Sequence, residues 1–280
     1  MKKLLLTIIV LTLAIFSAAC SSQSSASGKN KDVTVKVGVS GSDTRIWDYI
    51  AKKAEKKGIK IKIVSFSDYV LPNTALAEGE LDINAFQTNA YFVDFIKEHK
   101  IDLTQIGTTV IAPMGIYSDK YKSVKDIPDG GKIAIPNDAI NGGRALLLLQ
   151  EAGLIKMPKD FTGNGIDGKI ASNPKHLQIT PMVAAQTPRA LPDVAASVIN
   201  NGIAVDAGFN PVEDSVVHED KTAKPYINII AARTKDKNRK ELKEIVKLYQ
   251  QQDTADFIKK EYKGAMIPTF VPLTEIGVKN

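Results

Sequence analysis

Alternating hydrophobic residues early in the chain constrain the fold more than any other feature. Valine alternates with other residues over 33–39, a pattern typical of a β-strand. An amphipathic segment follows, with Ile46, Trp47 and Ile50 on one side, and residues 59–66 (IKIKIVSF) form a second alternating run. Two neighbouring strands joined by a helix lie parallel, because the helix carries the chain back to the same end of the sheet. The sequence therefore predicts an α/β fold with a parallel sheet.

Three aromatic residues are expected at the ends of strands or the starts of helices. Tyr69 follows the second predicted strand, Phe86 ends the short run LDINAF, and Tyr91 lies in the first turn of a helix that Thr88 or Asn89 caps. Any one of these rings alone is better explained as an ordinary core residue. In open α/β sheets, however, this edge is where ligands bind. The common position of the three rings therefore favours a ligand site.

The strand and helix pattern restarts after a long extended stretch at residues 101–121, which Pro113 interrupts. A stretch of that length indicates a crossing from one lobe to another, and residues 225–233 (PYINIIAAR) indicate the return. We therefore expect two α/β lobes joined by two crossover strands. The predicted division assigns residues 33–113 and 228–280 to lobe I and residues 114–227 to lobe II.

Several polar residues of the second half are candidates for ligand contacts. Arg144 is predicted in the first turn of a helix over 142–151, where a cation opposes the helix dipole and a bound carboxylate would offset that cost. Pairing with a nearby acidic residue explains Arg144 equally well. Asn141 is expected to cap this helix, Asn200 to end a strand, and Asn228 to face the cleft between the lobes.

The sequence offers no pattern for catalysis or metal binding. Its three histidines, His99, His176 and His218, lack metal-ligand spacing and a nearby cysteine. It has no G-x-S-x-G motif, and its acidic pairs have no spacing that suggests general acid and base. We therefore predict a protein that is not an enzyme and uses no cofactor or metal. Its charges are spread along amphipathic segments, which argues against a nucleic-acid partner.

The N-terminus indicates export. Lys2 and Lys3 precede an apolar run, residues 4–16, that is too short for a stable membrane span. Cys20 follows this run and is the chain's only cysteine, so no disulfide is possible within the chain. Residues 1–19 are predicted to be a signal peptide and residues 20–32 a lipidated, flexible tether. A plain secretory signal that ends near a cysteine is the alternative.

Five segments carry a resemblance to a known family, the methionine-binding lipoproteins of the NlpA/MetQ type. They are FSDYVLPNTALAEGELDINAFQ, TTVIAPMGIYS, IPNDAINGGRALLLLQEAGLI, PRALPDVAASVIN and PYINIIAAR. These proteins are the substrate-binding components of ABC importers. The resemblance implies a bilobed periplasmic-binding-protein fold, type II-like, that closes on an amino acid. The departures are Ser17, where the lipidation motif usually has leucine, and Thr88, where the family commonly has histidine.

The resemblance also implies roles for the candidate residues. Arg144 resembles the family's contact to the ligand carboxylate, Asn200 and Asn228 its polar contacts, and Tyr69, Phe86 and Tyr91 its thioether pocket. Thr88 and Asn141 complete the predicted site. Replacing Arg144 with alanine should then weaken ligand binding and leave the melting temperature of the empty protein nearly unchanged.

The function implied is delivery of L-methionine to a membrane permease and its ATPase. The smaller side chain of Thr88 leaves open a methionine-containing dipeptide such as glycyl-methionine. A surface lipoprotein with an adhesive or signalling role is the alternative from another class. In each case we expect a monomer, held at the extracytoplasmic face of the cell membrane by lipid on Cys20.

Overall fold

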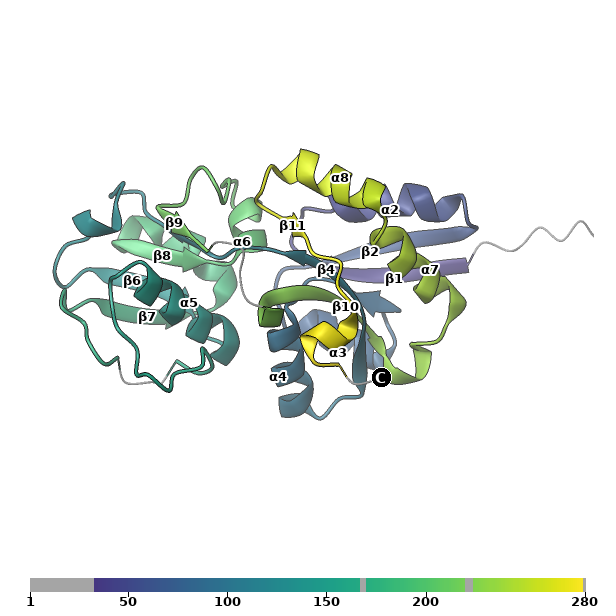
Figure 1. Cartoon of the computed structure of the whole chain (residues 1–280), viewed down its shortest axis with the longest axis horizontal. Helices are drawn as coiled ribbons and strands as arrows, with labels where there is room; N and C mark the ends of the chain where they lie inside the picture. Colours follow the sequence, from purple (N-terminus) through teal and green to yellow (C-terminus); the bar gives the residue numbers. More distant parts are fainter. Residues whose placement is uncertain (1–32, 167–169, 220–223, 279–280) are drawn as a thin grey trace, which may run out of the picture. The chain divides into compact units, whose positions relative to one another are not determined.

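The computed structural model describes residues 33–166, 170–219 and 224–278, which form two β-sheets with helices packed against them (Figure 1). The first sheet has six strands in the order β11-β4-β10-β3-β1-β2. Its strands are β1 (Val33–Ser40), β2 (Ile59–Phe66), β3 (Ile83–Asn84), β4 (Leu103–Ile111), β10 (Ile227–Arg233) and β11 (Ile267–Pro268). As predicted, β1 lies parallel to β2, and it is also parallel to β3.

The second sheet has five strands in the order β7-β6-β8-β5-β9. Its strands are β5 (Gly115–Tyr117), β6 (Lys132–Pro136), β7 (Gln178–Met182), β8 (Ala196–Ile199) and β9 (Val217–His218). The chain enters this sheet between β4 and β5 and returns to the first sheet between β9 and β10. Each sheet also contains antiparallel pairs next to the crossings. Strand β10 is antiparallel to β3 and β4 in the first sheet, and β5 is antiparallel to β8 in the second, where β8 is parallel to β6.

Seven α-helices of the described chain connect these strands. They are α2 (Arg45–Glu55), α3 (Leu71–Glu78), α4 (Asn89–His99), α5 (Ala139–Glu151), α6 (Asn201–Asp206), α7 (Lys240–Tyr249) and α8 (Gln252–Tyr262). Short 3-10 helices are η1 (Val124–Asp126), η2 (Ala184–Gln186), η3 (Pro188–Asp193), η4 (Lys224–Tyr226), η5 (Thr234–Asp236) and η6 (Leu273–Ile276). No helix of these described ranges is long and apolar enough to cross a membrane.

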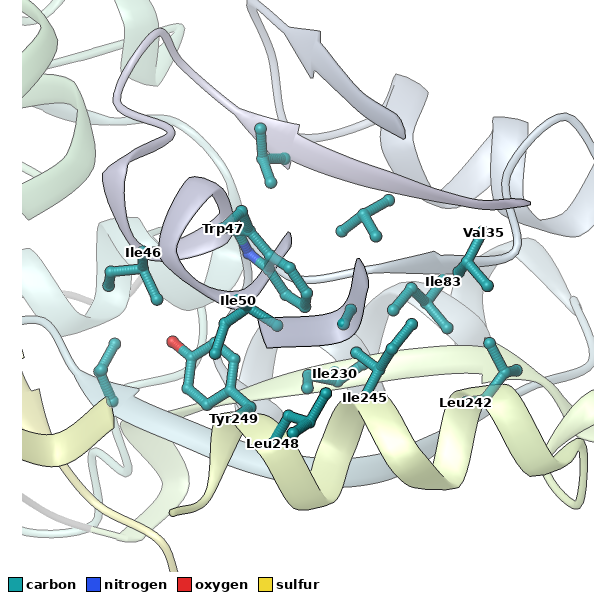
Figure 2. Close-up of a cluster of buried hydrophobic side chains, with 14 of the residues drawn as sticks. Val35, Ile46, Trp47, Ile50, Ile83, Ile230, Leu242, Ile245, Leu248 and Tyr249 are labelled. Carbon is teal, nitrogen blue, oxygen red and sulfur yellow. The ribbon is translucent and has the colours of Figure 1, made fainter. Parts of the chain in front are cut away.

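Helices cover both faces of the first sheet. Because successive side chains of a strand point to opposite sides, each central strand contributes to the core on both faces. Strand β10 illustrates this: Ile230 belongs to the core cluster with α2, α7 and α8, and Ile229 belongs to the cluster with α3 and α4. Figure 2 shows the first cluster, where Trp47 of α2 packs against Tyr249 of α7 with ring centroids 5.4 Å apart. The predicted hydrophobic face of α2 is thus confirmed.

The C-terminal helical region consists of two helices, α7 and α8, that follow each other directly in the chain. They are separated because Gln251 adopts an extended backbone, with φ −78° and ψ 155°. Both helices pack against α2. The break lets the chain turn so that two short helices, rather than one long one, cover this face of the sheet.

Candidate ligand-binding site

A cavity of about 140 Å³ is lined by strands β1, β4 and β10 of the first sheet, by helices α2 and α4, and by helices α5 and α6, which neighbour the strands of the second sheet in sequence. All of the predicted site residues line it: Tyr69, Phe86, Thr88, Tyr91, Asn141, Arg144, Asn200 and Asn228. A larger adjoining cleft, about 810 Å³, shares five of the cavity's lining residues. These shared residues are Ser40, Tyr69, Tyr91, Ile203 and Asp206. The structure therefore brings together side chains that are far apart in the sequence.

Three rings form one wall of the cavity. The ring centroids of Tyr69 and Phe86 are 5.9 Å apart, those of Tyr69 and Tyr91 6.0 Å, and those of Phe86 and Tyr91 6.4 Å. Such separations are those of favourable aromatic pairs. The Tyr91 hydroxyl donates to the carbonyl of Tyr69 at 3.1 Å. Burial raises the pKa of both tyrosines well above the usual range, so the wall is uncharged.

Local turns fix these rings in place. The Asp68 carboxylate accepts hydrogen bonds from the backbone N–H groups of Val70 and Leu71, at 2.7 and 2.8 Å, and so ends the turn before α3 that carries Tyr69. The Thr88 hydroxyl caps α4 by accepting from the N–H of Tyr91 at 3.2 Å. Of the two predicted caps, Thr88 is therefore the correct one. Thr88 therefore both caps α4 and lines the cavity.

A buried amide network supports the segment that carries Phe86. Gln87 Nε2 donates to the side-chain oxygens of Asn73 at 2.7 Å and Asn84 at 3.0 Å, and Asn73 Nδ2 donates back to Gln87 Oε1 at 2.8 Å. Asn84 also donates to the carbonyl of Pro72. Satisfied buried networks of this kind hold one geometry, because breaking any member leaves an unpaired polar group. The sequence analysis did not identify this support.

The helix that carries Asn141 and Arg144 begins earlier than predicted. Helix α5 starts at Ala139, and Asp138 is its cap, accepting from the N–H of Asn141 at 2.8 Å. Asn141 is therefore not the cap, and Arg144 lies in the second turn rather than the first. The expected conflict between Arg144 and the helix dipole is absent for that reason, since the effect falls off beyond the first turn.

A chain of side chains orients Asn200. Asn141 Nδ2 donates to both carboxylate oxygens of Asp138 at 3.1 Å, which turns Asn141 Oδ1 toward Asn200 Nδ2, 2.8 Å away. The remaining oxygen of Asn200 is buried and has no hydrogen-bond partner among the described residues. Burial raises the pKa of Asp138, and the hydrogen bonds from Asn141 oppose that shift. Asn200 thus keeps one unsatisfied acceptor at the cavity wall.

Arg144 is held by residues that the sequence analysis missed. Its Nε lies 2.7 Å from Glu219 Oε1 and its Nη2 lies 2.5 Å from Glu219 Oε2. Nη2 also donates to the carbonyl of Ala112 at 3.2 Å, and the guanidinium lies over the ring of Tyr226, 4.3 Å from its centroid. A buried arginine demands a counter-ion, but the sequence does not say which of its 31 acidic residues supplies it.

Asn228 lies in β10, in the first sheet, beside Thr88. The two residues form an isolated antiparallel bridge, and Asn228 Nδ2 donates to the carbonyl of Val110 at 3.2 Å. The strand ladder therefore fixes the backbone of Asn228 where its side chain lines the cavity.

A contact between the loop after β1 and helix α6 lies beside the cavity, which Asp206 lines. The backbone N–H and the hydroxyl of Ser42, after β1, both donate to Asp206 Oδ1 of α6 at 2.7 Å. Gly41 is required here, because its φ is +88° and a Cβ atom would lie only 2.0 Å from Asp206 Oδ2. Helix α2 has Thr44 at its cap position, with no side-chain cap hydrogen bond there.

The described residues contain no group of three or more histidine, cysteine, aspartate or glutamate side chains that could hold a metal ion. The charged and polar groups of the cavity are instead arranged as hydrogen-bond donors and acceptors around an aromatic wall. This combination suits an organic ligand with an apolar end and a polar end.

Comparison with known proteins gives the family. A model described as NlpA lipoprotein matches residues 35–270. The chain belongs to this family. Uncharacterized lipoprotein YhcJ from Bacillus subtilis is 39% identical over 277 residues, which span 99% of this chain and 97% of the relative. D-methionine-binding lipoprotein MetQ from Salmonella typhimurium is 40% identical over 240 residues, which span 83% of this chain and 87% of the relative.

A solved structure supports the same assignment. The nutrient binding protein from Burkholderia cenocepacia bound to methionine is 44% identical, has a TM-score of 0.80, and is matched over 84% of this chain and 100% of its own. The predicted fold, two α/β lobes of the substrate-binding type, is therefore confirmed for this NlpA-family chain. The role of each site residue in ligand binding stays a prediction, as do the lobe boundaries at 113/114 and 227/228.

Proposed function

We propose that this NlpA-family protein binds free L-methionine in the cavity and delivers it to an ABC permease and its ATPase. The observation that carries the proposal is the cavity itself, whose lining combines the rings of Tyr69, Phe86 and Tyr91 with the polar side chains of Arg144 and Asn200. A thioether packs well against aromatic rings, and an α-amino acid presents one anion and one cation. The methionine-bound relative from Burkholderia cenocepacia supports this ligand.

The polar contacts suit a zwitterion. The ligand ammonium would donate to the buried oxygen of Asn200 that lacks a partner among the described residues. The ligand carboxylate would accept from Arg144 and from Asn228, which both line the cavity. Unsatisfied buried acceptors cost about 1 to 3 kcal/mol, and a ligand that supplies the missing donor removes this cost, less what its own ammonium loses on leaving water.

The volume of the cavity favours a free amino acid over a dipeptide. The cavity has a volume of only about 140 Å³, so the smaller of the two candidate ligands suits it better. The adjoining cleft is the feature that favours the alternative ligand, glycyl-methionine. It shares Tyr69 and Tyr91 with the cavity and has room for an extra residue, about 810 Å³.

A titration of the ligand-stripped protein tests the proposed function. We expect methionine to bind most tightly. Norleucine should bind roughly 2- to 13-fold more weakly, because the sulfur–aromatic contact contributes about 0.3 to 1.5 kcal/mol. Alanine should bind at least about 50-fold more weakly, because each buried methylene contributes about 0.8 kcal/mol. Calorimetry measures all three affinities.

The same titration separates the alternatives. Equal affinity for alanine and methionine would show that the cavity does not recognise the side chain. Binding of glycyl-methionine alone would replace the amino acid by the dipeptide and leave the fold assignment intact. Binding of none of these ligands would favour the adhesive or signalling role.

We also propose that Cys20 carries the lipid anchor at the extracytoplasmic face of the membrane; this residue lies outside the described ranges. Two or more acyl chains hold a protein firmly, whereas one chain anchors it only marginally. Cys20→Ala should therefore move the folded protein from the membrane fraction to the soluble fraction, as measured by fractionation and immunoblotting. Ser22→Ala is the matched control and should stay in the membrane fraction. If the Cys20→Ala protein also stayed there, the lipid anchor would be excluded.

A further inference from the structure

Glu219 acts on the cavity through its pairing with Arg144. Arg144 lines the cavity, and Glu219 is not among the lining residues. The two side chains are paired through two hydrogen bonds, and the residues are only 2% and 5% exposed. Glu219 Oε2 also accepts from the backbone N–H of Met114 at 2.8 Å, which ties the pair to the segment between β4 and β5. The guanidinium is therefore neutralised before any ligand arrives.

This pairing limits what Arg144 offers to a ligand. Its Nε and Nη2 face Glu219, and Nη2 also donates to the carbonyl of Ala112. Only Nη1 has no hydrogen bond to another described residue, so a ligand carboxylate meets one nitrogen rather than a two-nitrogen fork. The ligand carboxylate and Glu219 would then be two anions that share a single cation, and like charges at such short range repel, the more so away from water.

We propose that Glu219 is a specificity-determining counter-ion, which keeps Arg144 stable in the empty cleft and lowers the preference of the cavity for a ligand carboxylate. The inference rests on the proposed function. It gives Glu219 two linked effects. The carboxylate of Glu219 stabilises the ligand-free protein by pairing with Arg144. Because Glu219 already balances the positive charge of Arg144, the ligand carboxylate is a second anion beside that one cation. Both effects ease the release of an amino acid, which a delivery protein requires.

The test compares methionine with methioninamide, which has the same side chain and ammonium but a neutral amide in place of the carboxylate. One charge-assisted hydrogen bond corresponds to roughly a 10- to 150-fold difference in affinity. The wild-type protein should prefer methionine within that range. Glu219→Gln removes the competing anion, so the preference for methionine should rise at least tenfold in calorimetry. The variant without ligand should melt at a lower temperature, and methionine should raise its melting temperature more than that of the wild type.

A matched variant separates charge from shape. Glu219→Asp keeps the negative charge, and its preference for methionine over methioninamide should stay within about threefold of the wild-type value. If Glu219→Gln leaves the preference unchanged or lowers it, Glu219 has only a structural or positioning role and the inference is overturned. If Glu219→Gln does not fold, the wild-type preference decides: a value above roughly 150-fold overturns the inference, and a value below it supports the inference.

The outcome also distinguishes this inference from the proposed function. A wild-type protein that binds neither methionine nor methioninamide would overturn both. A wild-type protein that binds methionine, together with a Glu219→Gln protein of unchanged preference, would overturn the inference alone.

Discussion

Arg144→Met should destabilise the empty protein strongly as well as weaken ligand binding. The sequence alone suggested that the loss of Arg144 would leave the melting temperature nearly unchanged, but the structure gives a different expectation. Removing Arg144 leaves the Glu219 carboxylate buried without its cation. Breaking one partner of a buried ion pair costs about 3 to 5 kcal/mol. For a chain of this size, that cost lowers the melting temperature by roughly 6 to 20 °C.

The binding effect is smaller and is measured separately. The variant should bind methionine roughly 10- to 150-fold more weakly, the equivalent of one charge-assisted hydrogen bond. Calorimetry at a temperature where the variant is folded gives this affinity, and thermal unfolding without ligand gives the stability.

A double variant is the matched control. Arg144→Met combined with Glu219→Leu removes both charges and fills the same space with apolar groups, so most of the lost stability should return. Its affinity for methionine should stay low, because the carboxylate contact is still missing. An Arg144→Met protein that unfolds at the wild-type temperature would show that the Glu219 pair contributes little, contrary to this expectation.

The parts of the fold that the sequence predicted correctly depend on local patterns. The alternating residues of β1 and β2 and the apolar face of α2 can be recognised within single segments. Side chains on one face of a strand recur at every second residue, and those on one face of a helix recur three or four residues apart. The rings at 69, 86 and 91 could likewise be placed at one edge of the sheet, since each directly follows or begins an element. The structure gathers them around one cavity, as expected.

The errors and omissions arise from contacts between distant residues or from competing local signals. Asp138, Asn141 and Gly142 are all acceptable helix starts, and the choice of Asp138 depends on a carboxylate that accepts from both the backbone and the side chain of Asn141. Glu219 pairs with Arg144 across 75 positions, and Asp206 binds Ser42 across 164. No single-segment pattern encodes either pairing, because each exists only after the elements have packed.

A glycine-containing loop beside α5 has a packing role. This loop, residues 163–165, covers the start of α5, where Gly165 N–H donates to the carbonyl of Ala139 at 2.9 Å. A Cβ atom on Gly143 would lie 2.2 Å from the carbonyl oxygen of Gly163 and 2.5 Å from its carbon. These are backbone atoms, which cannot rotate away as a side chain could. The close approach of helix and loop therefore depends on glycine at 143.

Gly143→Ala should consequently move α5 away from the loop and disturb the binding residues that it carries. Overpacking costs about 1 to 3 kcal/mol and occasionally more, which exceeds the gain of roughly 1 kcal/mol in helix propensity. Binding sites tolerate displacements of only about 0.5 Å, and both Asn141 and Arg144 are within two residues of the substitution. We therefore expect methionine affinity to fall at least about tenfold, measured by calorimetry, along with the free energy of unfolding in urea.

Gly202→Ala is the matched control for stability, because it also replaces a helical glycine. No heavy atom lies within 4 Å of the Cβ that it would add, so α6 accepts the methyl group without a shift. Its free energy of unfolding should stay the same or rise by up to about 1 kcal/mol, the gain in helix propensity. Equal stability of Gly143→Ala and Gly202→Ala would mean that the protein relieves the clash with Gly163 at no cost. The loop would then not be what holds α5 in position. A Gly143→Ala protein that is destabilised but binds methionine normally would separate the two roles, since the loop would then support the fold without orienting Arg144.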